Sequence, residues 1–275
     1  MRLSCVGLVA GVSWLAVAAG AARPLAAQSA VCRSESAAAR LDHVTVAVRD
    51  LASAASSFRD TLGFSLKDGR VHANGLRNVH VRFADGSALE LMSVGDGAPD
   101  ELSGWYTRFL QEGEGGAFVA LRAGPVDTVL ALLGELSGEA RVLEGPAFDW
   151  VSFPAGHPLH AVFFVHVRSR PADAPGHVRH RNGASGLSEV WLRSSEPRIL
   201  ADLLRMLGAT PCGEVSGSGG LSGLGFGLAA GSLVVVPDHF PAIEPRILSV
   251  ILSGDRSRPG VRSSGVWIEW VKSGS

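Results

Sequence analysis

The sequence predicts an α+β protein built from repeated β-α-β-β-β modules, three of them complete and a fourth truncated. Three observations lead to this fold class. Short runs of residues alternate between apolar and polar side chains, as strands do, and each complete module also contains one run with helical periodicity. The same order of elements recurs along the chain. Finally, the 34 glycines are numerous enough to supply many turns between short strands.

The first module opens with the strand-like stretch "LDHVTVAV" at residues 41–48. Strict alternation predicts one face with Asp42, Val44, Val46 and Val48, and an opposite face that carries His43. A helix follows in "RDLASAASSFRDTLGFSL", with Asp50 as N-cap and Gly63 at its end. Strands in "FSLKDG", "NVHVRFAD" and "ALELMSV" complete the module.

The later modules repeat this order. Residues 116–146 give a strand, a helix and a further strand, and the module ends in "HAVFFVHVRSR" at 160–170. A third module begins at 186 and ends at 238, and a truncated fourth covers 246–274. We therefore expect a first domain over 41–170 and a second half over 186–275. Segments 96–114 and 171–185 are rich in Gly, Pro and charge, which predicts linkers.

The N-terminus has the pattern of a signal peptide over residues 1–28, with Arg2 ahead of an apolar run and small residues near a cleavage point. A linker at 29–40 would follow. The Ala-, Gly- and Arg-rich composition suggests a bacterium, so we expect a periplasmic or secreted protein with no membrane contact after signal cleavage. Cys32 and Cys212 then remain, either as a disulfide or as two unrelated cysteines. The net charge of −1 shows no basic excess for nucleic acid.

"LDHVTVAVRDLASAASSFRDTLGFSL" followed by "FADGSALELMSV" resembles the opening module of the vicinal oxygen chelate superfamily, the glyoxalase, bleomycin-resistance and extradiol-dioxygenase group. The later "FFVHV" and "HRNGASGLSEVWL" resemble its glyoxalase-like domain proteins. The resemblance implies that two modules form a half-open barrel that cups a divalent metal. It also implies that the ligands come from the first and last strands of each module.

On that resemblance His43 is a metal ligand, and Glu90 in "ALELMSV" is the second. The two are 90 − 43 = 47 positions apart. Phe118 aligns with His43 in the second module, and adding 48 positions reaches His166, the third expected ligand. Two imidazoles and a carboxylate suit Fe(II), Mn(II), Zn(II) or Ni(II), with open positions for substrate. The alternative is a core histidine hydrogen-bonded to Glu90.

Further residues are candidates for contact with substrate. Arg77 can pair with a carboxylate, and Asn78 can hydrogen-bond to substrate, whereas a solvated hairpin is favoured for His80. Phe118 would line the cup. His180, beside an Asn-Gly turn, is a candidate general base, and a solvent-facing histidine is the alternative.

The corresponding positions of the second half are occupied by Glu189, Val234, Ser249 and Glu269, a poor set for a transition metal. This half is therefore interpreted as a scaffold or lid.

Three functions follow from the sequence. The first is an exported metalloenzyme that chelates vicinal oxygens of a small organic substrate, of the lyase, isomerase or dioxygenase class. The second is a metal-free protein that binds or sequesters a small molecule with the same fold. The third is a structural paralogue whose cup is filled by side chains, Phe118 and Phe164 among them. The sequence leaves the substrate and the oligomeric state open.

Overall fold

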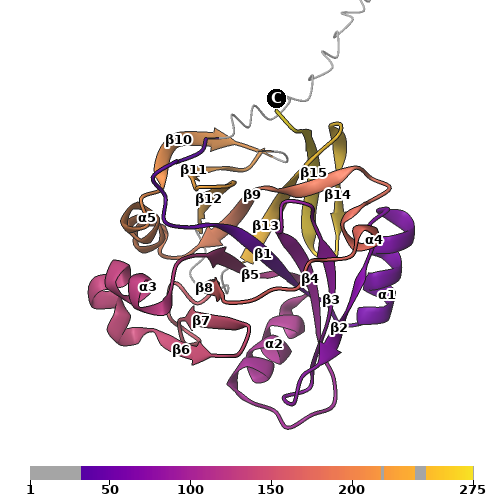
Figure 1. The fold of residues 1–275 in the computed structure, drawn as a ribbon, viewed down its shortest axis with the longest axis horizontal. Coiled ribbons are helices and arrows are strands. Elements are labelled where there is room, and N and C mark those ends of the chain that lie inside the picture. Colours follow the sequence, from indigo (N-terminus) through magenta and orange to yellow (C-terminus); the bar gives the residue numbers. More distant parts are fainter. Residues whose placement is uncertain (1–31, 218–219, 239–245, 275) are drawn as a thin grey trace, which may run out of the picture.

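A computed structural model describes residues 32–217, 220–238 and 246–274. Within these ranges the strands join one continuous 15-stranded mixed sheet, which curls into two half-barrels (Figure 1). The protein is α+β and consists of β-α-β-β-β modules, as the sequence predicts. The signal peptide predicted over 1–28 lies outside the described residues. No helix in the described part of the chain is long and apolar enough to cross a membrane.

The first module shows how local sequence forms each element. Asp50 is the N-cap of the helix and accepts a 3.1 Å hydrogen bond from the backbone N–H of Ser53. Gly63 ends the helical segment with φ of +78°, a conformation that costs glycine little. The module comprises β1 (Arg40–Ala47), α1 (Leu51–Ser56), the π-helical turn η1 (Ser57–Thr61), β2 (Lys67–Val71), β3 (Leu76–Arg82) and β4 (Ala88–Val94).

The same pairing recurs in each module: the first strand is parallel to the last, and the remaining strands follow the last one in antiparallel order. The second module comprises β5 (Gly115–Arg122), α3 (Val126–Leu133), the 3-10 turn η2 (Gly134–Glu139), β6 (Arg141–Glu144), β7 (Phe148–Ser152) and β8 (Val162–Val167). The third comprises β9 (Ala184–Ser194), α5 (Pro197–Met206), β10 (Thr210–Ser216), β11 (Ser222–Gly227) and β12 (Ser232–Pro237). The truncated fourth comprises β13 (Arg246–Gly254), β14 (Arg258–Ser263) and β15 (Val266–Lys272).

Two predicted linkers contain helices instead. Segment 96–114 holds α2 (Glu101–Glu112), and segment 171–185 holds the short α4 (Pro175–Val178). Asp100 and Ser103 form a capping box that starts α2, and Trp105, Tyr106 and Phe109 bury its inner face. Glycine, proline and charge flank this helix, so composition alone masked its apolar stripe.

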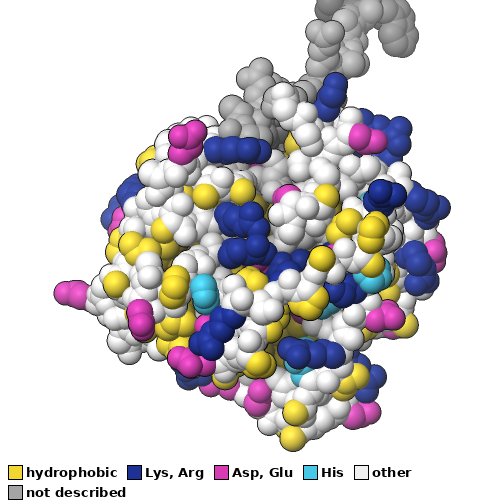
Figure 2. Space-filling model, in the orientation of Figure 1, with side chains coloured by type: hydrophobic (Ala, Val, Ile, Leu, Met, Phe, Trp, Pro, Cys, Tyr) yellow, Lys and Arg dark blue, Asp and Glu magenta, His cyan; other side chains and the backbone are white. Residues whose placement is uncertain are grey.

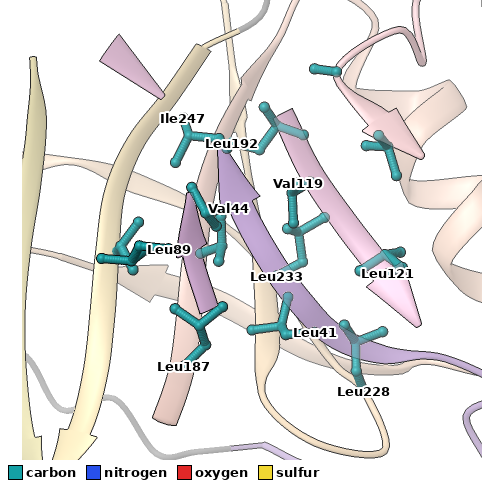
Figure 3. Packing of buried hydrophobic residues seen from close by; sticks show 14 of the residues in the cluster. Leu41, Val44, Leu89, Val119, Leu121, Leu187, Leu192, Leu228, Leu233 and Ile247 are labelled. Carbon is teal, nitrogen blue, oxygen red and sulfur yellow. The ribbon is translucent and has the colours of Figure 1, made fainter. Parts of the chain in front are cut away.

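The main core is one cluster of buried residues from the strands of both halves and from the helices α1, α3 and α5, and Figure 3 shows part of it. Val44, Val46 and Val48 enter it as predicted, but Asp42 does not. A β-bulge between Leu41 and His43 breaks the alternation of β1. Leu41 therefore points into the core, and the Asp42 side chain approaches His43.

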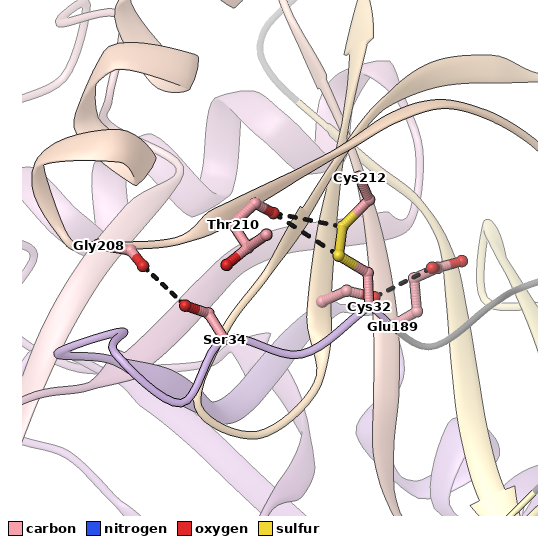
Figure 4. The surroundings of a disulfide bond; sticks show 7 residues. Cys32, Ser34, Glu189, Gly208, Thr210 and Cys212 are labelled. Carbon is pink, nitrogen blue, oxygen red and sulfur yellow. Dashed lines mark hydrogen bonds between the residues drawn. A yellow bond between two sulfur atoms is a disulfide. The ribbon is translucent and has the colours of Figure 1, made fainter.

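Cys32 and Cys212 form a disulfide across 180 positions of sequence (Figure 4). It ties the segment that precedes β1 to β10 of the second half. Ser34 strengthens this attachment because its hydroxyl donates a 2.9 Å hydrogen bond to the carbonyl of Gly208. Closing so long a loop lowers the entropy of the unfolded chain, which stabilises the fold by about 5 kcal/mol in the chain-entropy account.

Candidate functional site

The inner face of the first half-barrel, called here the first cup, is formed by alternate residues of β1, β3, β4, β5 and β8. Cross-strand pairing fixes which residues share this face: Thr45 lies opposite Glu90 on one side and Phe118 on the other. Helix α2 closes one end of the cup with an apolar cluster. The buried members of this cluster are Ala47, Leu76, Met92, Trp105, Tyr106, Phe109, Leu110, Ala117 and Phe118.

His43 lies on the wall of the first cup between two carboxylates. Its Nδ1–H donates a 2.8 Å hydrogen bond to Asp42, and its Nε2 lies 3.6 Å from Glu90 Oε2. The Asp42 bond fixes the ring orientation and leaves Nε2 facing the cup. The His43 side chain is 17% exposed, so it is in contact with solvent. The sequence pointed to His43 but not to Asp42, which strict alternation places on the other face.

Asp42 is fully buried and is held by three positive or donor groups. Arg122 donates to its Oδ2 at 2.6 Å, and Arg170 lies 3.4 Å from its Oδ1. Burial opposes ionisation, but the hydrogen bond from His43 and the charges of His43, Arg122 and Arg170 outweigh it. Together they hold the pKa of Asp42 well below its ordinary value. Asp42 is therefore ionised at neutral pH behind the imidazole.

Glu90 is the second buried carboxylate of the cup. The side-chain amide of Asn78 donates a 2.5 Å hydrogen bond to Oε1, and Thr45 lies at 3.5 Å from Oε2. Burial works against the charge of Glu90, yet His43, His80 and the Asn78 amide lower its pKa below the ordinary value. Asn78 thus sits in the cup, as the sequence predicts, and its amide binds this carboxylate.

His80 is a member of the site that the sequence interpretation assigned to a solvated hairpin. It lies directly opposite Glu90 on the neighbouring strand. Burial lowers the pKa of His80 even though the Glu90 charge acts in the opposite sense. The signal was present in the sequence: His80 shares strand parity with Asn78, two positions away.

Tyr106 of α2 is buried at the apolar end of the cup, close to Thr45. Its hydroxyl hydrogen-bonds to Thr45, and burial together with the Glu90 charge raises the pKa of this phenol well above its ordinary value. Tyr106 therefore stays protonated and caps the apolar end of the cup. Sequence reasoning missed it because its helix lies in a predicted linker.

The structure does not bring His166 to this group. His166 lies opposite Asp149 on β7, in a separate cavity of about 200 Å3 on the outer face of β8. The residue of β8 that faces the cup is Phe163, whose ring lies 5.4 Å from that of His43. In the first module Thr45, two positions after His43, pairs with Glu90. In the second module Ala120, two positions after Phe118, pairs with Phe163, so the matching spacing there is 163 − 118 = 45 positions. A spacing of 48 differs by an odd number and therefore reaches the opposite face.

The donor set of the cup does not fit a divalent metal. Of the four positions where the modules converge, His43 and Glu90 carry donor atoms, while Phe118 and Phe163 carry none. Across the described ranges, no three His, Cys, Asp or Glu side chains are grouped so that they could hold a metal ion. Two protein ligands fall short of the three or four typical of such sites.

Two other candidates lie away from the cup. His180 is packed edge-on against Phe64 and Phe83, where its Nδ1 accepts from the Ser65 backbone and its Nε2 donates to the Arg82 carbonyl. Burial lowers its pKa. Arg77 is exposed on the face of β3 opposite Asn78. Both placements correspond to structural or solvent-facing roles.

Comparisons with known proteins agree with this architecture. A family model described as "Glyoxalase-like domain" matches residues 41–208, more than half of the chain. No curated protein sequence matches. A hypothetical protein from Staphylococcus aureus has a similar fold, with a TM-score of 0.62 and 13% identity over 85% of this chain and 99% of its own.

Two enzymes have the same fold. A mutant of 4-hydroxymandelate synthase from Streptomyces coelicolor gives a TM-score of 0.55 at 13% identity, covering 87% of this chain and 92% of its own. A 2,3-dioxygenase from Pseudomonas sp. KL28 gives 0.55 at 12% identity, covering 88% and 94%. At these identities the likeness concerns the fold alone.

Proposed function

The chain belongs to the glyoxalase-like domain family of the vicinal oxygen chelate superfamily, and from this premise we propose that its first cup binds a small organic molecule and transfers a proton without a metal. One observation carries the proposal: an imidazole is fixed between two ionised carboxylates in a partly open cup. Asp42 holds Nδ1–H, so Nε2 carries the lone pair that accepts a proton. The reaction class is isomerase or lyase.

The chemistry balances with the residues present. His43 Nε2 removes a proton from carbon beside a carbonyl group, and the electron pair delocalises onto the carbonyl oxygen. Asp42 and Glu90 stabilise the imidazolium that forms, since they lie 2.8 Å and 3.6 Å from its two nitrogens. Return of the proton to carbon completes an isomerisation, and expulsion of a neighbouring leaving group completes an elimination.

A metal-dependent oxygenase or lyase was the leading expectation from the resemblance. It has less support, because Phe118 and Phe163 stand at the two positions that would have to supply a further ligand. Fe, Mn, Zn or Ni bound at one equivalent, and lost in His43→Ala or Glu90→Ala, would restore that function in place of the one proposed. Metal analysis of protein purified with each of these ions measures this directly.

Export remains part of the proposal. The Cys32–Cys212 disulfide supports an oxidising compartment such as a bacterial periplasm or the extracellular space. Mass spectrometry of the protein recovered from the native host tests it, because removal of residues 1–28 and two fewer free thiols are expected after export. An intact N-terminus with both thiols reduced would contradict it.

Solvent exchange tests the proton transfer itself. The protein is incubated in D2O with a panel of small keto, hydroxy and β-keto acids, and deuterium incorporation at carbon is followed by NMR. His43→Gln should abolish incorporation, whereas His166→Gln, a histidine outside the cup, should leave it unchanged. Tight binding of a panel member without exchange in the wild type would instead establish a metal-free binding protein.

A further inference from the structure

A cluster of arginines lies at the end of the first cup opposite the one closed by α2. We call it the arginine rim, and its members are Arg40, Arg82, Arg122 and Arg170. Three of them donate to a single carbonyl, that of Gly86, at 3.0–3.3 Å. Figure 2 shows Lys and Arg side chains gathered across the centre of this face, in the region of β1 and β4.

The positive charge of the rim exceeds the negative charge that pairs with it. Asp42 pairs with Arg122 and Arg170, and Asp173 pairs with Arg82 and Lys67. Four cations, three rim arginines and Lys67, therefore share two carboxylates, and Arg40 adds a fifth positive charge. Burial lowers the pKa of Arg170, with the charges of Arg82 and Arg122 acting in the same sense, although Asp42 opposes the shift. Such an excess is costly in the absence of a further anion.

Arg40 and Arg122 show this imbalance most clearly. They lie directly opposite each other on β1 and β5, and like charges in that arrangement destabilise a sheet. Arg40 makes no ion pair within 4.0 Å among the described residues. Its Nε is buried there without a hydrogen-bond partner. One ligand oxyanion between the two guanidinium groups would satisfy both.

The rim and the proton-transfer pair share one face of the sheet. Ala120 lies opposite His43, and Arg122 is two positions further along the same strand. Ala88 lies beside both His43 and Arg82. Asp42 connects the two regions, because its Oδ1 accepts from His43 and contacts Arg170. A ligand whose anion meets the rim would thus present its neighbouring carbon toward the imidazole.

We propose that the arginine rim is the anion-binding subsite of the cup and that its ligand is a small organic acid, held by a carboxylate or phosphate at Arg40, Arg122 and Arg170. The inference rests on the proposed function for the role of His43, but anion binding at the rim does not require that function. Guanidinium groups bind both oxyanions in bidentate geometry, so the rim recognises the chemistry they share.

Isothermal titration at constant ionic strength tests the subsite with three probes: inorganic phosphate, benzoate and the neutral isostere benzamide. The wild type should bind one equivalent of phosphate or benzoate at millimolar concentration and should bind benzamide much more weakly. The anion that binds with the higher affinity identifies whether the rim prefers a phosphate or a carboxylate group. Loss of one charged hydrogen bond should weaken anion binding about tenfold in Arg40→Gln and in Arg170→Gln.

Arg193→Gln is the matched control. Arg193 belongs to the second half, pairs with Asp238, and has a side-chain exposure of 21% against 22% for Arg170. This variant should bind both anions as the wild type does. Thermal melts of all three variants confirm that they are folded, and Arg40→Gln keeps the test informative if loss of Arg170 unfolds the protein, since Arg40 has no ion pair to lose.

Two results overturn the inference: no binding of either anion to folded wild type, or equal affinity in all three arginine variants. The two proposals also fail separately. Anion binding that persists in His43→Gln while no panel acid exchanges deuterium retains the rim and removes the proton transfer. Deuterium exchange of a neutral ketone at the same rate as of its acid analogue retains the proton transfer and removes the rim.

Discussion

The two halves of the molecule use the same strand pairings to build two different cups. Glu189 of β9 takes the place of His43, Val234 that of Glu90, Ser249 that of Phe118 and Glu269 that of Phe163. The first cup keeps its polar pair on one module and its apolar pair on the other. The second places its two carboxylates on the first strand of one module and the last strand of the other.

The largest difference between the two cups is at the next inward-facing residue of β9, two positions after Glu189. Trp191 occupies there the place that Thr45 has in the first cup. Trp191 is buried, and its indole N–H donates a 2.7 Å hydrogen bond to Glu189. Ser232 donates to the other oxygen of Glu189, and Trp267 likewise donates to Glu269. Trp191 and Trp267 thus lie in the second cup and form hydrogen bonds with its two carboxylates, Glu189 and Glu269. Thr45 is smaller than Trp191 and donates no hydrogen bond to the His43 ring, so His43 keeps its partners Asp42 and Glu90.

The largest effect is expected when the first cup is given the two donors it lacks. Phe118→His with Phe163→Glu places donor atoms at all four converging positions, so the variant should bind Zn(II) or Ni(II) with micromolar affinity, about 8 kcal/mol of binding free energy. Titration calorimetry of the wild type and the variant measures the gain. Equal metal binding by both would show that the phenylalanines are not what prevents it.

Removal of the tryptophan that fills the second cup should destabilise the protein. Trp191→Ala leaves a cavity and frees Glu189 from its indole partner, so the free energy of unfolding should fall by about 3–5 kcal/mol. Urea denaturation measures the loss. Trp267→Ala, at a partly exposed position of the same half, provides the control and should cost less. A change of similar size in both variants would argue against a filled second cup.

Asp42 should make the stability of the first half depend on pH in the acid range. Its pKa in the folded protein lies below the ordinary value, so the unfolded chain takes up the proton first as the pH falls. The stabilisation is therefore complete above about pH 4 and is lost as the pH falls further. Asp42→Asn should lower the free energy of unfolding by about 3 kcal/mol at neutral pH, because it leaves the arginines unpaired. Asp42→Asn should also flatten the acid part of the stability profile. Asp149→Asn, on β7 outside the cup, should leave the contribution of Asp42 intact.

The smallest effect concerns His80 and needs no ligand. Glu90→Gln removes the negative charge that opposes the effect of burial, so the pKa of His80 should fall further below its ordinary value. An NMR titration of the imidazole protons follows it, with His166 as an internal reference outside the cup. An unchanged titration of His80 would mean that Glu90 does not act on it across the strands.

The modular fold was predictable because strand alternation and helical periodicity are local properties that recur in each module. His43, Glu90, Asn78 and Phe118 were predicted for the cup and lie in it. Their strands belong to the first module or are the first strand of the second, and in these strands the two modules can be aligned from sequence with few intervening loops. His166 and Phe163 differ by three positions, and only the hydrogen bonds between β5 and β8 decide which of them faces inward.

The sequence by itself therefore determined the modules and placed His43 and Glu90 on neighbouring strands. The tertiary structure alone decided the register of β8, the bulge that brings Asp42 behind His43, the closure of one end by α2 and the gathering of arginines at the other. The physical reason is that these features depend on contacts between residues far apart in the chain. In a sheet, a shift by an odd number of residues exchanges the two faces, so a small error in spacing moves a side chain from the cup to the outside.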